Sequence, residues 1–555
     1  MDATMMQFPL STQMILRRGA RLFENSQVMS FDGTQVRSVR YAEVAQRARQ
    51  LAAALRTHGL AQGDRVGTLC WNTQEHLEAY LAVPAMGAVL HTVNVRLAAD
   101  QVSYIVGHAE DRVLIIDASF VPLVAAIIAD LPSVDLIVVL GDAPADLPGF
   151  SGKIMGYDAL IDGVTPFADA DWPVLDEYSA AVMCYTSGTT GNPKGVVYSH
   201  RSIFLHSLAS LGADAFAISN RDTILMIPPM FHANAWGAPF SGWLAGSNFV
   251  LPGPHLQPEK LAHLIAVTRP SFAAAVPTIL NDLLLMHSRD PLDLSCFRVL
   301  ISGGSAVSPT LIERVRAAWG VGLIQGWGMT ETSPMCVLSF PPVDAPVDEE
   351  VQWRAKSGRP VAGMEVRIVD DEDQPLPEDG QAVGHLQLRG PWVTQGYYLQ
   401  AEADRPLTQD GWLRTGDAGT IDSRGYVQVT DRTKDLIKSG GEWISSVDLE
   451  NAVGRYPGVH EVAVIAVPDP RWEERPLVIL TTQEDRPIDF DDIRRFLSDQ
   501  IAKFMVPEYW AAIPSLPKTS VGKIDKRKLR EDVDAGRLPF VRVADPSRQG
   551  SPQNA

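Results

Sequence analysis

The segment 186–195 concentrates the residue types that bind phosphate. It contains four hydroxyl side chains, three glycines and one lysine, in the order Thr186-Ser187-Gly188-Thr189-Thr190-Gly191-Asn192-Pro193-Lys194-Gly195, after an apolar run at 180–184. Glycines let backbone N–H groups approach an anion closely, and hydroxyl and ammonium groups supply further donors. It is not a Walker A sequence, because proline precedes Lys194 and glycine follows it. The composition predicts a polyphosphate-binding loop; the alternative is a flexible surface loop.

Seven further motifs follow this loop along the chain. They are Pro-Met-Phe-His-Ala-Asn-Ala-Trp at 229–236, Ser-Gly-Gly-Ser-Ala at 302–306, Gln-Gly-Trp-Gly-Met-Thr-Glu at 325–331, Arg-Thr-Gly-Asp at 414–417, Asp-Arg-Thr-Lys-Asp at 431–435, Lys-Ser-Gly-Gly-Glu-Trp-Ile-Ser at 438–445 and Gly-Lys at 522–523. Together with the loop, they resemble the adenylate-forming superfamily of acyl-CoA synthetases, peptide adenylation domains and luciferases over residues 10 to 530. So many ordered matches are improbable by chance.

The resemblance implies an ATP and Mg²⁺ site. The phosphate contacts it assigns are Thr186, Ser187, Gly188, Thr189, Thr190, Gly191 and Lys194, and the nucleotide contacts of the later motifs are Gly303, Gly304, Ser305, Gln325, Gly326, Trp327, Gly328 and Thr330. Glu331 is the Mg²⁺ candidate, a hard oxygen ligand assisted by Thr186. Trp327 replaces the usual tyrosine of its motif and is expected to stack on adenine. The alternatives are a solvated charge for Glu331 and a core aromatic for Trp327.

The resemblance also assigns roles in the last third of the chain. Asp417 accepts hydrogen bonds from ribose, supported by Arg432 and Lys434, and Lys523 bridges the substrate carboxylate and the α-phosphate. Asp431 is the hinge, and the residues that enter after rotation to line a CoA channel are Gly440, Gly441, Glu442 and Trp443, while Lys438 of the same motif is a further cofactor-binding candidate. Lys523 lies among other basic residues of 518–530, which are either a solvated exterior or contacts for nucleotide or CoA phosphates.

The motif at 229–236 resembles the family's acyl site. His232 is a catalytic and substrate-binding candidate, and Ala233 and Trp236 are substrate-binding candidates, with Trp236 as the gate of an acyl tunnel or, alternatively, a core aromatic. The strings at 231–236 and 438–451 resemble bacterial fatty-acyl-CoA and methylmercaptopropionyl-CoA ligases most. We therefore expect a medium- or long-chain fatty-acyl-CoA ligase that uses ATP, Mg²⁺ and CoA. The alternatives are a CoA ligase for methylmercaptopropionate, an aromatic acid or a steroid side-chain acid, and a non-catalytic ATP-binding partner protein.

Helical and strand patterns alternate through the part of the chain that carries the first motifs. Helical spacing at 41–58, 76–86 and 309–319 alternates with short apolar runs at 65–70, 88–93 and 298–302, which predicts parallel βαβ units in two sheets or one large one. Short strands between turns follow from about residue 356 and predict an antiparallel subdomain. We expect an α/β fold with an N-terminal domain over 1–430, a small mobile α+β domain over 431–540 and a disordered tail over 541–555.

Composition excludes several other classes of protein. The 555 residues include 48 Lys plus Arg and 66 Asp plus Glu, a net charge of −18, which argues against a nucleic-acid binder. The four cysteines form no CxxC pair, so neither a zinc site nor a disulfide framework is expected. We expect a cytoplasmic protein without a secretory signal or a membrane span, whose partners are a carboxylic acid, ATP and CoA. Peripheral membrane contact and a homodimer stay open.

Overall fold

The computed structural model describes residues 3–186, 192–402, 405–433, 435–439, 442–482, 489–498, 500–519 and 523–543, with backbone only at 442 and 443. The chain divides into two compact units. The first unit comprises Met1–Glu365 and Leu388–Leu413, and the second comprises Val366–Gln387 and Arg414–Ala555. The boundary expected at residue 430 stays a prediction.

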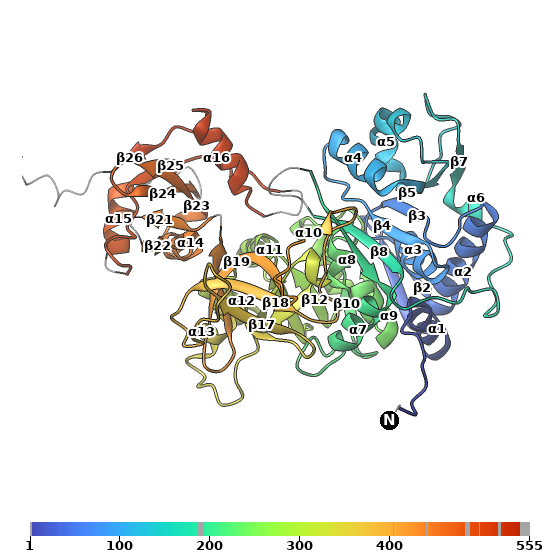
Figure 1. Cartoon of the computed structure of the whole chain (residues 1–555), viewed down its shortest axis with the longest axis horizontal. Helices are drawn as coiled ribbons and strands as arrows, with labels where there is room; N and C mark the ends of the chain where they lie inside the picture. Colours follow the sequence, from blue (N-terminus) through green and yellow to red (C-terminus); the bar gives the residue numbers. More distant parts are fainter. Residues whose placement is uncertain are drawn as a thin grey trace, which may run out of the picture. The chain divides into compact units, whose positions relative to one another are not determined.

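One sheet of the first unit has the strand order β7-β6-β5-β3-β4-β8-β9 and is parallel except for the β8–β9 pair. Its strands are β3 Arg65–Leu69, β4 Val89–Thr92, β5 Asp111–Asp117, β6 Leu136–Leu140, β7 Lys153–Gly156, β8 Ala180–Tyr185 and β9 Gly195–Ser199. The helices between and before them are α2 Tyr41–Thr57, α3 Gln74–Ala85, α4 Ala99–Ala109, α5 Val121–Ile127 and α6 Tyr157–Ile161 (Figure 1). The helix–strand alternation predicted from the sequence is therefore confirmed.

The other sheet of this unit has the order β16-β15-β14-β13-β12-β10-β11-β1-β2 and is parallel from β14 to β1. Its strands are β1 Gln27–Phe31, β2 Val36–Arg40, β10 Thr223–Leu225, β11 Asn248–Leu251, β12 Phe272–Ala275, β13 Val299–Gly303, β14 Leu323–Gly328, β15 Met335–Leu338 and β16 Arg359–Pro360. The helices are α1 Thr12–Leu22, α7 His200–Ser210, α8 Ala233–Trp236, α9 Ala238–Ala245, α10 Pro258–Thr268, α11 Pro277–Arg289, α12 Pro309–Trp319 and α13 Glu350–Ala355. Two separate sheets, rather than one large one, therefore form this unit.

Local signals explain where these helices begin and end. The Ser308 hydroxyl accepts the Leu311 N–H at 3.2 Å, Pro309 occupies the first turn of α12, and Gly320 ends the helix at φ +70°. Helix α3 is buried almost throughout and packs against β4 and β8 of one sheet and β1 of the other. It therefore lies between the two sheets and shares its apolar surface with both.

The second unit contains a sheet in the order β17-β18-β19-β20 and another built around β24. The elements are β17 Glu365–Val369, β18 Gly384–Arg389, β19 Leu413–Ile421, β20 Val427–Arg432, β21 Ile437–Ser439, β22 Glu442–Ile444, α14 Ser446–Val453, β23 Val459–Asp469, β24 Glu473–Thr482, α15 Phe490–Ser498, β25 Tyr509–Ala512, α16 Lys526–Asp534 and β26 Val541–Arg542. Side chains alternate along β24: Val478 packs with residues of α14 and α15, and Ile479 packs with Leu529 of α16. The sheet around β24 is thus covered on both faces, which confirms a small α+β unit.

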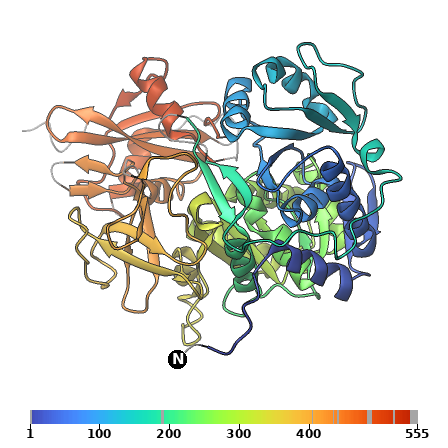
Figure 2. The same cartoon turned by 45° about the vertical axis from the view of Figure 1, so that its right-hand side comes forward.

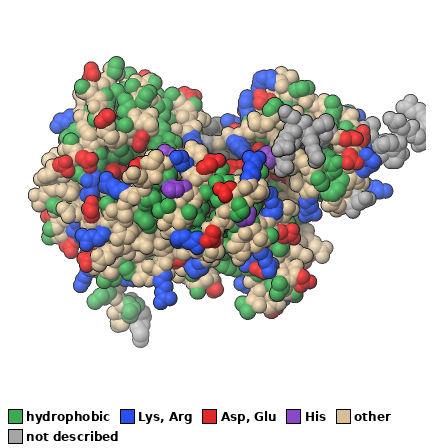
Figure 3. All heavy atoms as spheres, turned by 180° about the vertical axis from the view of Figure 1, so that it is seen from behind, with side chains coloured by type: hydrophobic (Ala, Val, Ile, Leu, Met, Phe, Trp, Pro, Cys, Tyr) green, Lys and Arg blue, Asp and Glu red, His purple; other side chains and the backbone are tan. Residues whose placement is uncertain are grey.

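On the face drawn in Figure 3, acidic and basic side chains are interspersed. In the described part of the chain, no helix is long and apolar enough to cross a membrane.

Candidate active site

The predicted phosphate loop lies in the sequence between β8 and β9, which pair as an antiparallel hairpin in the first unit (Figure 2). The Thr186 N–H donates to the Lys194 carbonyl at 2.9 Å, and Tyr185 pairs with Gly195 in the antiparallel register. Thr186 is half-buried and Lys194 is exposed. The predicted phosphate contacts Ser187, Gly188, Thr189, Thr190 and Gly191 lie outside the described residues. The hairpin thus fixes both ends of the loop, with its lysine open to an incoming anion.

A tyrosine that sequence reasoning missed links this loop to the magnesium candidate. The Tyr397 hydroxyl donates to Glu331 Oε1 at 2.7 Å, and the Lys194 ammonium lies 4.9 Å from the centre of the Tyr397 ring. The neighbouring Tyr398 N–H donates to the Gly195 carbonyl at 2.8 Å. The segment around Gly396-Tyr397-Tyr398 therefore holds the lysine end of the loop and Glu331 together. Its signal in the sequence is only a glycine followed by two aromatic residues in an irregular stretch.

The carboxylate of Glu331 suits a divalent cation. Only 7% of Glu331 is exposed, and within the described residues it forms no ion pair with Lys, Arg or His. A buried carboxylate without a cationic partner is costly, so its position favours a hard metal ion. No group of three or more His, Cys, Asp or Glu in the described residues could hold a metal by itself. This arrangement fits Mg²⁺, which proteins usually hold through one or two carboxylates together with substrate phosphates.

The adenine-contact candidates lie at the carboxyl ends of neighbouring parallel strands. Gly303 of β13 pairs with Gly326 of β14, and ligands of open α/β sheets bind at such strand ends. Gln325 Oε1 accepts the Val307 N–H at 2.7 Å, so this side chain supports the loop after β13. Trp327 and Gly328 are half-buried and follow on the same strand, whereas Gly304 and Ser305 are exposed. Next along the chain, Thr330 is buried and its carbonyl accepts the Tyr198 hydroxyl at 2.7 Å.

The acyl-site motif has an unusual backbone. Ala233, Asn234, Ala235 and Trp236 all have left-handed dihedrals, with φ of +43°, +54°, +47° and +59°. Such a turn costs roughly 1–2 kcal/mol per L-residue, so surrounding contacts must stabilise it. Gly237 continues at φ +77°, and a β-carbon there would come within 2.4 Å of the His206 ring. This left-handed turn was not predictable from the sequence, because two alanines and a tryptophan normally avoid that conformation and only Asn234 and Gly237 favour it.

Asn72, which lies just before α3, and Tyr80 within α3 supply part of that stabilisation. Asn72 Nδ2 donates to the Met226 and Pro228 carbonyls at 2.7 and 2.9 Å, and its Oδ1 accepts the Met230 N–H at 2.8 Å. The Tyr80 hydroxyl contacts the Met230 carbonyl and Asn234 Oδ1. These bonds satisfy the backbone on the approach to the turn and fix where it begins.

Trp236 forms one wall of an apolar pocket beside this turn. Its indole lies against Gly303, where a β-carbon would come within 3.1 Å of the ring. The rest of the lining is apolar except for Ser241, whose hydroxyl donates to the Gly237 carbonyl. It comes from Phe216, Ile218, β10 with Met226 and Pro228 after it, Ala235, α9, β12 and β13. The free volume is about 10 Å³, which is room for about one water molecule. His232 and Ala233 precede Trp236 on the turn but do not line this pocket.

The second unit brings other predicted residues together. Arg432 Nε contacts Asp417 Oδ1 at 2.8 Å, because β19 and β20 place the two residues opposite each other. Asp431 accepts the Ser446 N–H at 2.7 Å at the start of α14. Lys434, Gly440 and Gly441 lie outside the described residues, while Lys438 of β21 pairs with Trp443 of β22, next to Glu442. The structure therefore ties the predicted hinge residue to a helix.

The basic residues around Lys523 are paired with carboxylates. The pairs are Lys518–Glu461, Lys526–Glu450, Arg527–Glu531, Lys528–Asp532 and Arg530–Asp435. A phosphate would have to compete with these acids, so the pairing favours a charge-balanced surface over a preformed phosphate site. Lys523 itself is half-buried, and its backbone exchanges hydrogen bonds with Thr519.

Comparison with protein families identifies the chain. The AMP-binding enzyme model matches residues 16–398, and the AMP-binding enzyme C-terminal domain model matches residues 448–523. The chain belongs to the AMP-binding enzyme family. This finding confirms the resemblance to the adenylate-forming superfamily.

Individual members of the AMP-binding family narrow the activity. The chain is 44% identical to the long-chain-fatty-acid–CoA ligase of Thermus thermophilus, over 95% of this chain and 96% of that protein. It is 42% identical to the 3-methylmercaptopropionyl-CoA ligase of Ruegeria lacuscaerulensis, over 95% of this chain and 98% of that one. The anthranilate CoA ligase AuaEII in complex with anthranoyl-AMP superposes with a TM-score of 0.87 at 26% identity, covering 97% and 100% of the two chains. The chain is therefore an acid–CoA ligase, while its acid is not fixed by these similarities.

Proposed function

We propose that this AMP-binding enzyme activates a medium- or long-chain fatty acid. In the first step the carboxylate attacks the α-phosphate of ATP, which forms the acyl-adenylate and releases pyrophosphate. In the second step the CoA thiol attacks the acyl carbon and AMP leaves. Acyl-CoA ligases of this family use ATP and CoA as co-substrates and Mg²⁺ as cofactor. One observation carries the choice of acid: the pocket beside Trp236 is lined almost wholly by apolar side chains.

The side chains described above account for what the first step needs. Two anions must be brought together and charge on phosphorus must be neutralised, which positioned donors achieve best. We assign Lys194 and the loop to the phosphates, Thr330 to the α-phosphate, and Lys523 to the carboxylate and α-phosphate. When bound, Mg²⁺ supplies Lewis-acid neutralisation of phosphate charge, and Glu331 with Thr186 would hold it. Tyr397 orients the Glu331 carboxylate through its hydrogen bond.

We assign the remaining candidate residues to the adenine and the ribose of ATP. We assign adenine to Trp327 and the glycines at 303–304, and ribose to Asp417, which Arg432 orients by its 2.8 Å contact. A domain boundary at residue 430 with Asp431 as the hinge would let the domain over 431–540 exchange Lys523 for the loop at 440–443 between the two steps.

A short thioether acid is the second candidate substrate. With Trp236 against Gly303, the free volume of the pocket is only about 10 Å³, so a long chain requires the indole to move. A short acid such as methylmercaptopropionate needs less volume in the pocket than a long-chain fatty acid does. The choice between the two acids therefore depends on whether Trp236 opens.

Pyrophosphate release separates these possibilities. We would measure it with alkanoic acids from C4 to C16 and with 3-methylmercaptopropionate, each with and without CoA. The proposal predicts acid-dependent release with an optimum at C8 or longer, and acyl-CoA formation only when CoA is present. An optimum at methylmercaptopropionate would establish the second candidate, and acid-independent release would refute both.

A further inference from the structure

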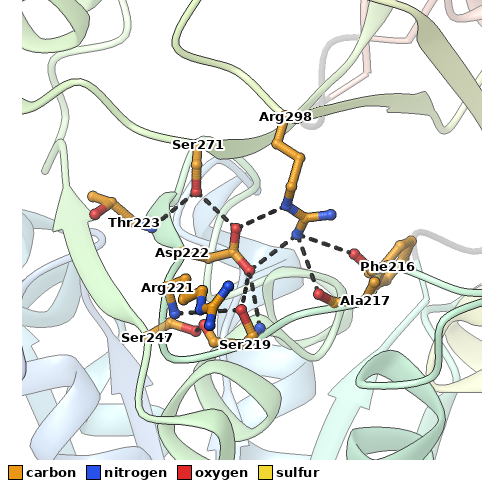
Figure 4. Close-up of polar contacts among 9 residues, drawn as sticks. All are labelled: Phe216, Ala217, Ser219, Arg221, Asp222, Thr223, Ser247, Ser271 and Arg298. Atoms are coloured by element: carbon orange, nitrogen blue, oxygen red, sulfur yellow. Dashed lines mark hydrogen bonds and ion pairs between the residues drawn. The ribbon is translucent and has the colours of Figure 1, made fainter.

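An ion pair with a buried carboxylate lies at the amino ends of three neighbouring strands of the first unit, at the opposite end of the strands from Gly303. Asp222 directly precedes β10, Ser271 precedes β12 and Arg298 precedes β13, so the parallel register brings them together (Figure 4). Arg298 Nε and Nη2 contact the two Asp222 oxygens at 3.1 and 3.0 Å, and the Ser271 hydroxyl donates to Asp222 Oδ1 at 2.8 Å. Asp222 is 2% exposed, whereas 43% of the Arg298 side chain reaches solvent.

The ion pair also holds the segment Phe216–Ser219. Arg298 Nη2 donates to the carbonyls of Phe216 and Ala217, the latter at 3.2 Å, and Asp222 Oδ2 accepts the Ser219 N–H at 2.9 Å. Figure 4 shows these bonds converging on Asp222 and Arg298. Ala217 has a left-handed φ of +50°, a conformation that an alanine adopts only when its surroundings impose it. The planar, multiply donating guanidinium suits this task, because it binds a carboxylate and backbone carbonyls at once.

This segment closes the acyl pocket at the end away from Trp236. Phe216 and Ile218 line the pocket, and the Phe216 ring packs edge-on against Phe272 with centroids 5.7 Å apart. Both side chains are at least 94% buried, yet the Arg298 side chain that holds their backbone is partly in solvent. The pocket floor is therefore thin, and solvent lies close behind it.

We infer that the Asp222–Arg298 ion pair sets the longest acyl chain that the enzyme accepts, by holding Phe216 and Ile218 as the pocket floor. This inference rests on the proposed fatty-acid activity. Phe272 pairs with Val299, four residues before Gly303, so the floor lies about 13 Å along β13 from the place where Trp236 contacts Gly303. Carbon–carbon bonds of about 1.5 Å give an extended chain roughly 1.25 Å per carbon, so a chain that spans this distance after the Trp236 indole has moved would contain about ten carbons. The limit thus belongs to medium chains.

Two variants test the floor and the ion pair separately. Phe216→Ala removes the floor and leaves the ion pair intact. Arg298→Lys keeps a positive charge beside Asp222 but loses the fork that also reaches the carbonyls. The matched control is Arg269→Lys, because Arg269 pairs with Asp293 at 2.7 Å with 48% of its side chain exposed and does not line the pocket.

The readout is the ratio of kcat/KM for an acid two carbons longer than the wild-type optimum to that for the optimum acid. Each methylene that contacts the apolar pocket wall raises kcat/KM roughly fourfold, so for two methylenes Phe216→Ala should raise the ratio of kcat/KM values by up to about 15-fold. Arg298→Lys should raise it at least threefold, and Arg269→Lys should leave it at the wild-type value. Circular dichroism verifies folding of each variant.

Each outcome decides the inference. If Phe216→Ala leaves the ratio unchanged, the floor is elsewhere and the inference is wrong. If Phe216→Ala raises the ratio but Arg298→Lys behaves like the control, the floor exists but the ion pair does not set it. A wild-type enzyme that releases no pyrophosphate with any alkanoic acid refutes the proposed function itself, before any variant is compared.

Discussion

Replacing Trp236 by alanine separates a gate from a core residue. The indole lines the apolar pocket, contacts Gly303 and is only half-buried. Alanine keeps the left-handed backbone at φ +59° under the same strain, whereas glycine would relax it as well. Trp236→Ala therefore changes the pocket wall with little change in backbone preference.

The size of the effect differs between the two roles. Truncating a fully buried tryptophan costs about 3–5 kcal/mol of unfolding free energy. Because one side of Trp236 faces the pocket, we expect about 1–2 kcal/mol here, from the same transfer and cavity terms applied to a half-buried ring. Each methylene of a bound chain that gains apolar contact is worth roughly 0.8 kcal/mol, so a two-carbon shift changes relative kcat/KM by about 15-fold.

Trp243 offers a matched control. It is fully buried, its ring stacks on Tyr41 at 3.9 Å, and its indole N–H donates to the Leu16 carbonyl at 3.2 Å. Trp243→Ala should lower the melting temperature strongly and leave the chain-length optimum unchanged, provided that the variant folds.

The assay is pyrophosphate release over C4 to C16 acids, with the KM for ATP and a thermal melt of each variant. For Trp236→Ala we expect a shifted chain-length profile, an unchanged KM for ATP and a small fall in melting temperature. A large fall in melting temperature with uniformly lower activity and an unchanged optimum would refute the gate and show that Trp236 is a core residue.

Other changes test the remaining assignments. Lys523→Ala should abolish most adenylate formation but spare thioester formation from supplied acyl-adenylate; equal loss of both half-reactions would contradict a role in one step only. Glu331→Gln should raise the Mg²⁺ concentration needed for half-maximal rate with little change in melting temperature, and an unchanged Mg²⁺ titration would remove Glu331 from the metal site. Tyr397→Phe should lower kcat roughly tenfold, the value of one hydrogen bond to a charged group, but should have little effect in a Glu331→Gln background, where that charge is already gone. Burial lowers the pKa of His76 and of His206 to about 4 from 6.5. As the pH falls from about 6.5 toward 4, the unfolded chain binds protons that the folded chain does not, so each histidine should cost up to about 1.4 kcal/mol of stability per pH unit. Melting temperatures that stay flat over this range would show that these histidines titrate normally.

The motifs were predictable from sequence because their signals are local. The proline and serine that begin α12 and the glycine that ends it lie within one short stretch, and the expected helix at 309–319 is found with those bounds. The glycine-rich loop, the Trp-Gly-Met-Thr-Glu stretch and the Arg-Thr-Gly-Asp stretch likewise carry their own signals, which sufficed for the family. Alternating periodicity predicted the βαβ units for the same reason.

Contacts between distant segments could not be predicted in this way, because local periodicity carries no information on which segments pack together. The hydrogen bond from the Tyr397 hydroxyl to Glu331 spans 66 residues, and that from the Met230 N–H to Asn72 Oδ1 spans 158. The left-handed turn at 233–236 exists only because neighbouring segments compensate its strain. The sequence by itself therefore determined the kind of chemistry and most of the candidate residues. The tertiary structure decided how Glu331 is oriented, which side chains line the pocket beside Trp236 and that Arg298 pairs with Asp222, since each of these depends on side chains that meet only after the sheets have formed.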